Sequence, residues 1–432
     1  MLLAVLILLI FLLFAVLMYT QKLPAILALP LMAIFIAAAA QVPLNDILVV
    51  VISNGSYRLG AAITVMFFGA ILGQFVNKSG IAETMIKKAA ELGGDRPLVV
   101  SLILGAVTAL LFTVLGGLGA VIMVATIVLP ILLSVGVPPM VAGCLFLLGL
   151  SLGGVLNLTN WQLYISVLGL SIDQIMPFAL PLTGIFLVVT VLFLVIEMKR
   201  EGRVRLWAEW EASPKRTVSW LALLTPLVPL VLVFGFSLYN LLAHPPQPFE
   251  FPIITALLFG LFYGVVTVYR RGLDMVNLLS QSIIEGIASV APAVALIIGI
   301  GMLLNAVAHP QVAMVISPIL AVVMPTNPLS YVLFFVLLSP LALYRGPLNI
   351  WGMGSGLIGL MLATRSLPAV AIMAALMAVG QIQGVCDPTN THNVWIANFL
   401  KIDVQDILKR TIIYVWLIAV FGLILGAVMY FR

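Results

Sequence analysis

The side chains best suited to bind a small ion lie in two short motifs that interrupt long apolar segments. Asn157–Asn160 reads Asn-Leu-Thr-Asn and Asp387–Asn390 reads Asp-Pro-Thr-Asn, 230 residues further along the chain. Broken helices inside a membrane expose carbonyl, hydroxyl and amide oxygens that coordinate Na⁺ or contact the polar groups of a small organic anion. The candidate substrate-binding residues in these motifs are Asn157, Thr159, Asn160, Thr389 and Asn390.

A glycine-containing stretch precedes each motif at the same spacing, and the second stretch carries an arginine. An arginine inside a membrane segment is costly and usually faces a cavity or a partner. The Arg345 guanidinium can hold a carboxylate through two parallel hydrogen bonds, although a structural ion pair with Asp387 is the alternative. For the first stretch, close helix packing is the alternative. The further candidate substrate-binding residues are Gly116, Gly117, Gly119, Arg345, Gly346 and Asn349.

Three residues are candidates for coupling transport to an ion: Asp387, Asn157 and His392. Burial favours the protonated form of a carboxyl group, which fits proton coupling, whereas Na⁺ or Arg345 would keep Asp387 ionised. His392 is a second candidate proton carrier, although a lone histidine is more often simply hydrogen-bonded. The three histidines and two cysteines have no metal-ligand spacing, so we expect no metal site and no cofactor besides a coupling ion, H⁺ or Na⁺.

The composition places these motifs in a membrane. Of 432 residues, 63% are hydrophobic and 8% are charged, and the mean hydropathy is +1.26. A soluble domain carries about 25% charged residues. These values exclude a disordered chain, a nucleic-acid binder and a disulfide scaffold. The apolar runs are continuous over roughly 20 residues, which predicts an all-α polytopic membrane protein in contact with the lipid bilayer.

An internal repeat with a constant offset of 230 residues organises the chain. Besides the polar motifs, it matches Leu115–Gly119 with Arg345–Asn349, and Pro138 with Pro368. The repeat predicts two halves, 1–198 and 217–432, joined by a charged cytoplasmic linker at 199–216. Each half is expected to contain five crossings, one re-entrant hairpin at the glycine-containing stretch and one helix broken at the polar motif. An amphipathic stretch, 44–57 or 273–286, is expected to precede the third span of each half as a separate element.

Five crossings are an odd number, so the second half is expected to be inverted relative to the first. The positive-inside rule supports this topology. With both termini outside, sixteen of the 20 Lys and Arg residues fall in cytoplasmic segments, three lie outside, and Arg345 stays in the membrane. We therefore expect a multi-pass protein of the plasma (inner) membrane.

This arrangement of two halves, each with a re-entrant hairpin and a broken helix, resembles the ion transporter superfamily. That superfamily includes the citrate–metal symporters and the gluconate and C4-dicarboxylate permeases. The closest motif-level similarity is to the citrate symporter group, through Gly154–Asn157 and then Leu168–Asp173. The resemblance implies a homodimer in which a transport domain moves in an elevator fashion against a scaffold. By role, it divides the chain into a scaffold of about 1–96 and 217–325 and a transport domain of about 97–198 and 328–432.

Together these features predict a transporter and no enzyme. The leading hypothesis is a secondary active symporter for a small organic anion, such as citrate, gluconate or a C4-dicarboxylate, driven by H⁺ or Na⁺. The alternative is a Na⁺/H⁺ antiporter of the same superfamily, in which Asp387 would be the exchange carboxylate. A third possibility is a membrane subunit that needs a separate binding protein.

Overall fold

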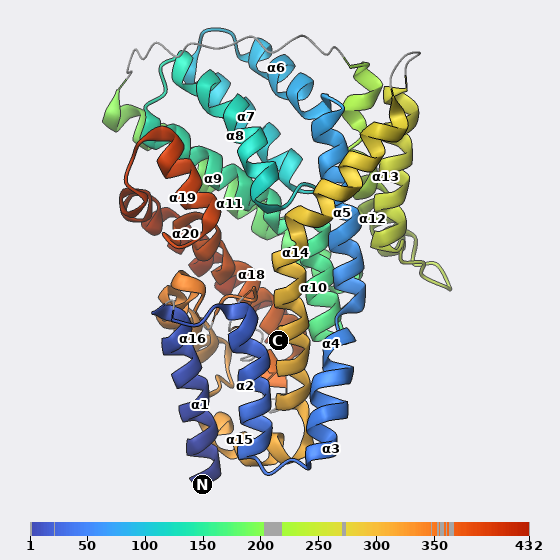
Figure 1. The fold of residues 1–432 in the computed structure, drawn as a ribbon. Helices are drawn as coiled ribbons and strands as arrows, with labels where there is room; N and C mark the ends of the chain where they lie inside the picture. Colours follow the sequence, from blue (N-terminus) through green and yellow to red (C-terminus); the bar gives the residue numbers. More distant parts are fainter. Residues whose placement is uncertain are drawn as a thin grey trace.

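The computed structural model describes residues 2–20, 22–202, 218–269, 274–346, 348–351, 354, 358–359, 361–362 and 367–431. Every regular element in these residues is a helix (Figure 1). Helices satisfy their own backbone hydrogen bonds, which the apolar interior of a bilayer requires. The predicted all-α class is therefore confirmed. Most of the predicted linker, residues 203–216, lies outside the described residues.

The first half contains two short helices, one very long helix, a helical hairpin, a broken helix and a final long helix. The long helix has a π-helical segment, η1, near its start. The bounds are α1 Leu2–Tyr19, α2 Ala25–Ala39, α3 Leu44–Asp46, η1 Ile47–Asn54, α4 Gly55–Tyr57, α5 Gly60–Lys78, α6 Ile81–Gly93, α7 Pro97–Phe112, α8 Gly117–Ser134, α9 Pro139–Val155, α10 Leu158–Leu168 and α11 Ile172–Glu201.

The second half follows a similar order, and much of its hairpin lies outside the described residues. The bounds are η2 Trp220–Leu224, α12 Leu227–Ala243, α13 Ile253–Val268, α14 Met275–Ala308, α15 Pro310–Val323, α16 Pro328–Leu338, η3 Ser339–Arg345, α18 Ala369–Cys386, α19 Thr391–Leu400 and α20 Val404–Tyr430.

Within the described part of the chain, six helices are long and apolar enough to cross a membrane, or seven when a bent pair counts as one span. That pair is α9 and α10, which meet at 48° across Leu156 and Asn157. The break falls at the first polar motif, as the sequence predicts. In the second half the chain leaves helical geometry at Asp387–Asn390, between α18 and α19.

The two expected amphipathic stretches are not separate elements. Leu44–Lys78 is a continuous helical segment of 35 residues, and α14 runs without interruption for 34. At 1.5 Å per residue each is about 50 Å long, well beyond the roughly 30 Å of hydrocarbon. The prediction is wrong because each stretch, as far as it is described, continues in helical geometry into the third span. One contact between the two long helices is made by the Asn305 amide of α14, which donates to the Val50 carbonyl of η1 at 2.7 Å.

These two long helices pack against each other in opposite directions. Gly55 approaches the backbone of Met302, while Gly286 approaches the backbone of Ile71. The offset of 230 converts the first pair into residues 285 and 72, which is one residue from the second pair on each helix. A two-fold axis between the halves would pair every contact with a second one in which the two helices have exchanged places. These two contacts form such a pair.

The broken helices meet at a second contact of the same kind. The Ser151 hydroxyl of α9 donates to the side-chain carbonyl of Gln381 on α18 at 2.8 Å. These two residues are 230 positions apart, so they are partners in the sequence repeat and also in space. Pro138 and Pro368, which precede the two helices, have matching backbone angles of φ −59° and ψ 144°. Both contacts agree with the predicted repeat, whose inverted topology and boundaries stay predictions.

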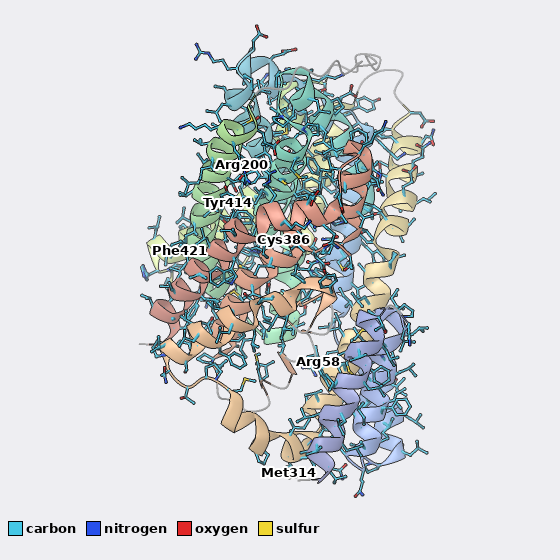
Figure 2. All side chains as sticks on the ribbon, turned by 90° about the vertical axis from the view of Figure 1, so that its left-hand side faces the viewer. Arg58, Arg200, Met314, Cys386, Tyr414 and Phe421 are labelled. Atoms are coloured by element: carbon cyan, nitrogen blue, oxygen red, sulfur yellow. The ribbon has the colours of Figure 1, made fainter. Side chains whose placement is uncertain are left out.

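A buried carboxylate joins the last helices of the two halves. Glu197 on α11 accepts hydrogen bonds from Arg410 and from the Tyr414 hydroxyl, both on α20. Figure 2 labels Arg200 and Tyr414 close together on this side of the molecule. Because the charge of Glu197 is paired and hydrogen-bonded, its burial is tolerated, and we read the cluster as structural.

Candidate functional site

The first polar motif is folded as the cap of a half-helix. Asn157, at the N-cap of α10, accepts hydrogen bonds on Oδ1 from the backbone N–H groups of Thr159, at 2.9 Å, and Asn160, at 3.3 Å. Asparagine is among the best N-cap residues because its side chain satisfies these otherwise unpaired donors. The Asn160 amide in turn donates to the carbonyl of Gly154 near the end of α9. The break is therefore held rigidly by its own side chains.

Asn157 also fixes the tip of the first hairpin. Its Nδ2 donates to the carbonyls of Phe112, at 2.8 Å, and Leu115, at 3.1 Å, where α7 ends. The chain then turns through Gly117, whose φ of +82° is readily adopted only by glycine. The structure thus brings Asn157 and the predicted tip glycines Gly116, Gly117 and Gly119 into one site.

Helices α5 and α14 form a wall against this site that sequence reasoning missed in part. A Cβ added at Gly69 of α5 would lie 3.0 Å from the Thr159 hydroxyl, and one at Gly73 would lie 3.2 Å from the Leu115 side chain. A Cβ at Gly119 would lie 3.6 Å from Nε2 of Gln74, also on α5.

The hairpin also approaches α14. A Cβ at Gly117 would lie 3.5 Å from the carbonyl of Ser289. The available sequence signal for this wall was Gln74, the single amide in the apolar run 60–76.

The second polar motif repeats the capping pattern with a carboxylate. Asp387 is fully buried, and its Oδ1 accepts from the Thr389 backbone N–H at 2.8 Å and from the Thr389 hydroxyl at 2.7 Å. Asn390 caps α19 by accepting from the His392 backbone N–H at 3.2 Å. The predicted residues Asp387, Thr389 and Asn390 are therefore brought together, and the half-buried side chain of His392 follows directly.

Asn393 is a buried member of this second site that the sequence analysis did not single out. Its Nδ2 donates to the carbonyls of Val385, at 3.0 Å, and Asp387, at 2.9 Å, across the break. Its side-chain oxygen has no hydrogen-bond partner in the described residues. It lies one helical turn after Asn390, which is the spacing that could have revealed it.

The tip of the second hairpin is described only in part. Asn349 accepts on Oδ1 from the Trp351 backbone N–H at 2.9 Å, and its own N–H donates to the carbonyl of Gly346. The backbone of Arg345 ends η3, but its side chain lies outside what the structure describes, as does Pro347. The expected contact of Arg345 with an anion or with Asp387 therefore stays a prediction.

The two sites differ in one chemical respect. Asn157 donates two hydrogen bonds to hairpin carbonyls, whereas an ionised carboxylate at the equivalent Asp387 can only accept. An ionised Asp387 therefore cannot donate to backbone carbonyls in the way that the Asn157 amide does. Packing of α10 on α18, and of α19 on α8 and α9, brings the two motifs toward the Ser151–Gln381 contact.

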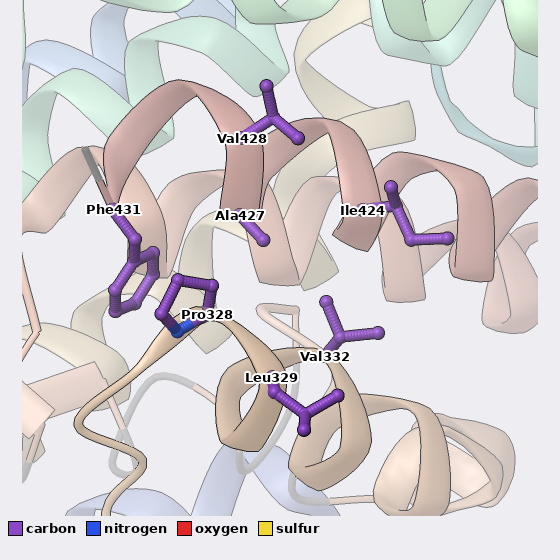
Figure 3. A pocket seen from close by; sticks show the side chains of 7 residues that line it. All are labelled: Pro328, Leu329, Val332, Ile424, Ala427, Val428 and Phe431. Carbon is purple, nitrogen blue, oxygen red and sulfur yellow. The ribbon is translucent and has the colours of Figure 1, made fainter.

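One further hollow is apolar and does not suit an anion. An apolar groove of about 400 Å³ between α16 and α20 (Figure 3) has only apolar lining residues, which suits lipid chains. Its lining residues are Pro328, Leu329, Val332, Ile424, Ala427, Val428 and Phe431.

Cys144 and Cys386 are both free and buried, and the thiol of Cys386 lies 3.2 Å from the Thr411 hydroxyl.

No protein-family model and no curated protein matches this sequence. Two solved structures resemble it over nearly its whole length. The YdaH transporter of Alcanivorax borkumensis has a TM-score of 0.63 and 15% identity, over 91% of this chain and 89% of YdaH. MtrF of Neisseria gonorrhoeae, from a class of antimetabolite efflux pumps, has a TM-score of 0.61 and 15% identity, over 90% of this chain and 84% of MtrF. The chain is a multi-pass membrane protein with the fold of solved transporters.

Proposed function

We propose that this protein is a secondary active transporter that moves a small organic anion by symport with H⁺ or Na⁺. The observation that carries the proposal is the fully buried Asp387 at a helix break, where the repeat partner Asn157 is neutral. Burial and nearby charge both bias the protonation of a carboxyl group, so the binding or release of a coupling ion beside it changes its charge balance. The fold shared with YdaH and MtrF supports transport as the setting for this chemistry.

The anion is proposed to bind between the two hairpin tips. α8 starts with no side-chain cap among the described residues, so its first N–H groups and positive dipole end suit a carboxylate. Arg345 at the second tip would supply the charge that the first tip lacks, with Thr159, Asn160, Thr389 and Asn390 contacting polar groups. The resemblance to citrate symporters and to gluconate and C4-dicarboxylate permeases favours a carboxylate, whereas the fold of MtrF raises outward transport as a possible direction.

The mode of transport is proposed to be elevator-type in a homodimer of the plasma membrane. The wall formed by α5 and α14 would belong to the fixed scaffold. The hairpins and broken helices would move past that wall.

Accumulation in liposomes tests the function. Purified protein is expected to concentrate a labelled carboxylate when an inward H⁺ or Na⁺ gradient is imposed, and Arg345→Ala is expected to abolish this. Arg96→Ala is the matched control, because Arg96 is exposed before α7 and away from both tips. Efflux of the preloaded anion against its gradient would show the opposite direction. Loss of activity in both arginine variants would deny Arg345 its assigned role.

A Na⁺/H⁺ antiporter is the second candidate, favoured by the same buried Asp387. It predicts that a Na⁺ gradient moves protons without any organic anion, which a pH-sensitive dye inside the vesicles would report. Proton movement of this kind, together with no carboxylate accumulation, would replace the symport proposal.

A further inference from the structure

One face of α5 follows the first candidate site from end to end. Gly69, Gly73 and Gln74 lie respectively beside Thr159 of the broken helix, Leu115 of the hairpin tip and Gly119 of α8. Two of these positions are glycines, whose lack of a side chain lets the site approach closely. The third position is occupied by a long amide side chain.

The Gln74 amide has no hydrogen-bond partner among the residues that the structure describes. It is half-buried, on a helix whose neighbouring residues Phe75 and Val76 are fully buried. Neither polar atom of Gln74 is among the fully buried, unpaired side-chain atoms of the described chain, so the amide remains accessible. An accessible, unpaired amide beside a candidate binding site is free to bond to a ligand.

The repeat supplies an independent comparison. The offset of 230 pairs Gln74 with Leu304, which is buried and apolar, and pairs Gly119 with Asn349, which carries an amide. In the first half the long helix carries the amide, Gln74, and the hairpin position is a glycine, Gly119. In the second half the amide is on the hairpin and the long-helix position is apolar. Each half therefore has one amide in this pair of positions, on opposite partners.

We propose that Gln74 is a specificity-determining residue that contacts the bound anion at the first hairpin. Its Nε2, which a Cβ added at Gly119 would approach to 3.6 Å, donates a hydrogen bond to an anion oxygen held near Gly119. This inference rests on the proposed function, since it assigns a further contact in the same site.

Because Gln74 lies on α5, it can contact the anion in only one position of the hairpin. α5 belongs to the predicted scaffold and α8 to the predicted transport domain, so movement of the hairpin carries the anion away from Gln74. The residue therefore acts on affinity from one side of the membrane only. Contacts that travel with the anion, such as those of Thr159 and Asn160, act on both sides.

The test compares Gln74→Leu with wild type in oriented liposomes, with labelled citrate, gluconate and succinate supplied on either side. We expect the KM for the transported anion to rise about ten- to hundredfold on one side, the loss expected for a hydrogen bond to a charged group, and to stay within about twofold on the other. Gln281→Leu is the matched control, because Gln281 is an exposed amide on α14 that bonds to Lys78 and Asn277. Equal KM values for Gln74→Leu and wild type on both sides would overturn the proposal.

A transfer variant separates ligand contact from a structural role. Gln74→Ala/Gly119→Asn moves the amide from the long helix to the hairpin, as in the second half. We expect Gln74→Ala to lose affinity and the double variant to regain most of it, now on both sides. A double variant that melts like wild type but keeps the full loss of affinity overturns the proposal. Wild-type protein that transports none of these carboxylates and is not stabilised by them would instead remove the proposed function itself.

Discussion

At the scale of single residues, the difference between Asn157 and Asp387 dominates the chemistry of this protein. Each accepts a hydrogen bond on Oδ1 from the backbone N–H of the threonine two positions later, Asn157 at the N-cap of α10 and Asp387 directly after α18. Asn157 has an NH₂ group left to hold the hairpin carbonyls of Phe112 and Leu115. An ionised Asp387 has no such donor, and this difference is the basis of the proposed coupling role.

Asp387→Asn is expected to convert the second site into a copy of the first. The variant should fold, since its side-chain oxygen can still accept from the Thr389 backbone N–H and its NH₂ group can donate to backbone carbonyls as that of Asn157 does. It should lose gradient-driven accumulation at least tenfold while retaining exchange of labelled for unlabelled anion, because binding no longer needs the coupling ion. Uptake and counterflow in the same liposomes measure both. Asp406→Asn, which changes an exposed acid on α20 paired with Lys409, is the control. Ion-driven accumulation by Asp387→Asn at the wild-type level would contradict the coupling role.

At the scale of elements, the crossing of the two long helices sets the geometry of the molecule. Gly55 and Gly301 face each other so closely that a Cβ on Gly301 would fall on the Gly55 carbonyl. Small residues of this kind let helices in membranes pack at short distance. The crossing fixes α5, and α5 in turn holds Gly69, Gly73 and Gln74 against the first site.

Gly301→Ala is therefore expected to destabilise the protein. Forcing a methyl group into a backbone contact costs about 1–3 kcal/mol, because neither helix can move without disturbing its other neighbours. Thermal melting in detergent should show a lower midpoint for Gly301→Ala. Gly60→Ala is the matched control, since a Cβ there meets nothing within 4 Å. Equal melting of the two variants would show that the crossing is not tight in the folded protein.

A second contact between elements lies at the start of α11. Asp173 accepts a hydrogen bond from Ser237 of α12, and both residues line a cavity of about 350 Å³ that also contains His244. Glu250, in the loop after α12, accepts hydrogen bonds from Ser171 and the Ile172 N–H. Burial and then repulsion by Asp173 raise the pKa of Glu250, partly offset by these hydrogen bonds.

This contact predicts a pH dependence whose sign follows from the raised pKa of Glu250. Protonation is easier in the docked loop than in a free one, so lower pH strengthens docking. As pH rises through the raised pKa, ionised Glu250 repels Asp173 and docking weakens. Because the contact joins the predicted scaffold to the predicted transport domain, acidification should slow transport.

The effect is checked by measuring transport rates at a fixed ion gradient while the pH is varied on the side of the membrane where the Glu250 loop lies. Glu250→Gln should be slow and pH-independent over the same range, and Ser237→Ala should be faster. A Glu250→Gln variant with the wild-type pH profile would refute the assignment.

At the scale of the whole molecule, the proposed elevator-type transport makes relative movement of two parts the central expectation. The broken helices pack against α11 and α20, while α2 packs against α14 and α1 packs against α2 (Figure 1). The face of α5 is where these two groups meet at the first site.

A disulfide across that face should stop transport. A Cβ at position 73 would lie 3.8 Å from the Leu115 Cα, so the two Cα atoms are closer than the upper limit of about 6.8 Å that a disulfide spans. Gly73→Cys/Leu115→Cys, in a background with Cys144→Ala and Cys386→Ala, is expected to lose at least nine-tenths of its transport on oxidation and to recover on reduction. Each single cysteine variant should be insensitive to the oxidant. Full transport by the cross-linked protein would exclude movement of the hairpin against α5.

Much of this organisation could be predicted from the sequence. The 230-residue offset located both breaks, the first hairpin tip and Asp387, because helix breaks inside apolar segments need polar and glycine residues that stand out from their surroundings. The long helix Leu44–Lys78 was divided wrongly, because its polar positions resemble those of a surface helix when the partner α14 is not seen. Gln74 and Asn393 were missed, because a single amide in an apolar run shows its importance only through what lies beside it.

The sequence by itself determined the all-helical membrane class, the repeat and the residue types at each break, since periodicity, hydropathy and spacing are properties of the chain alone. Only the tertiary structure decided that Ser151 meets Gln381, that α5 lines the first site and that Asn157 ties the broken helix to the hairpin. These contacts join residues from 42 to 230 positions apart. Which apolar faces find each other over such separations depends on the packing of all the helices together, and local sequence patterns do not encode it.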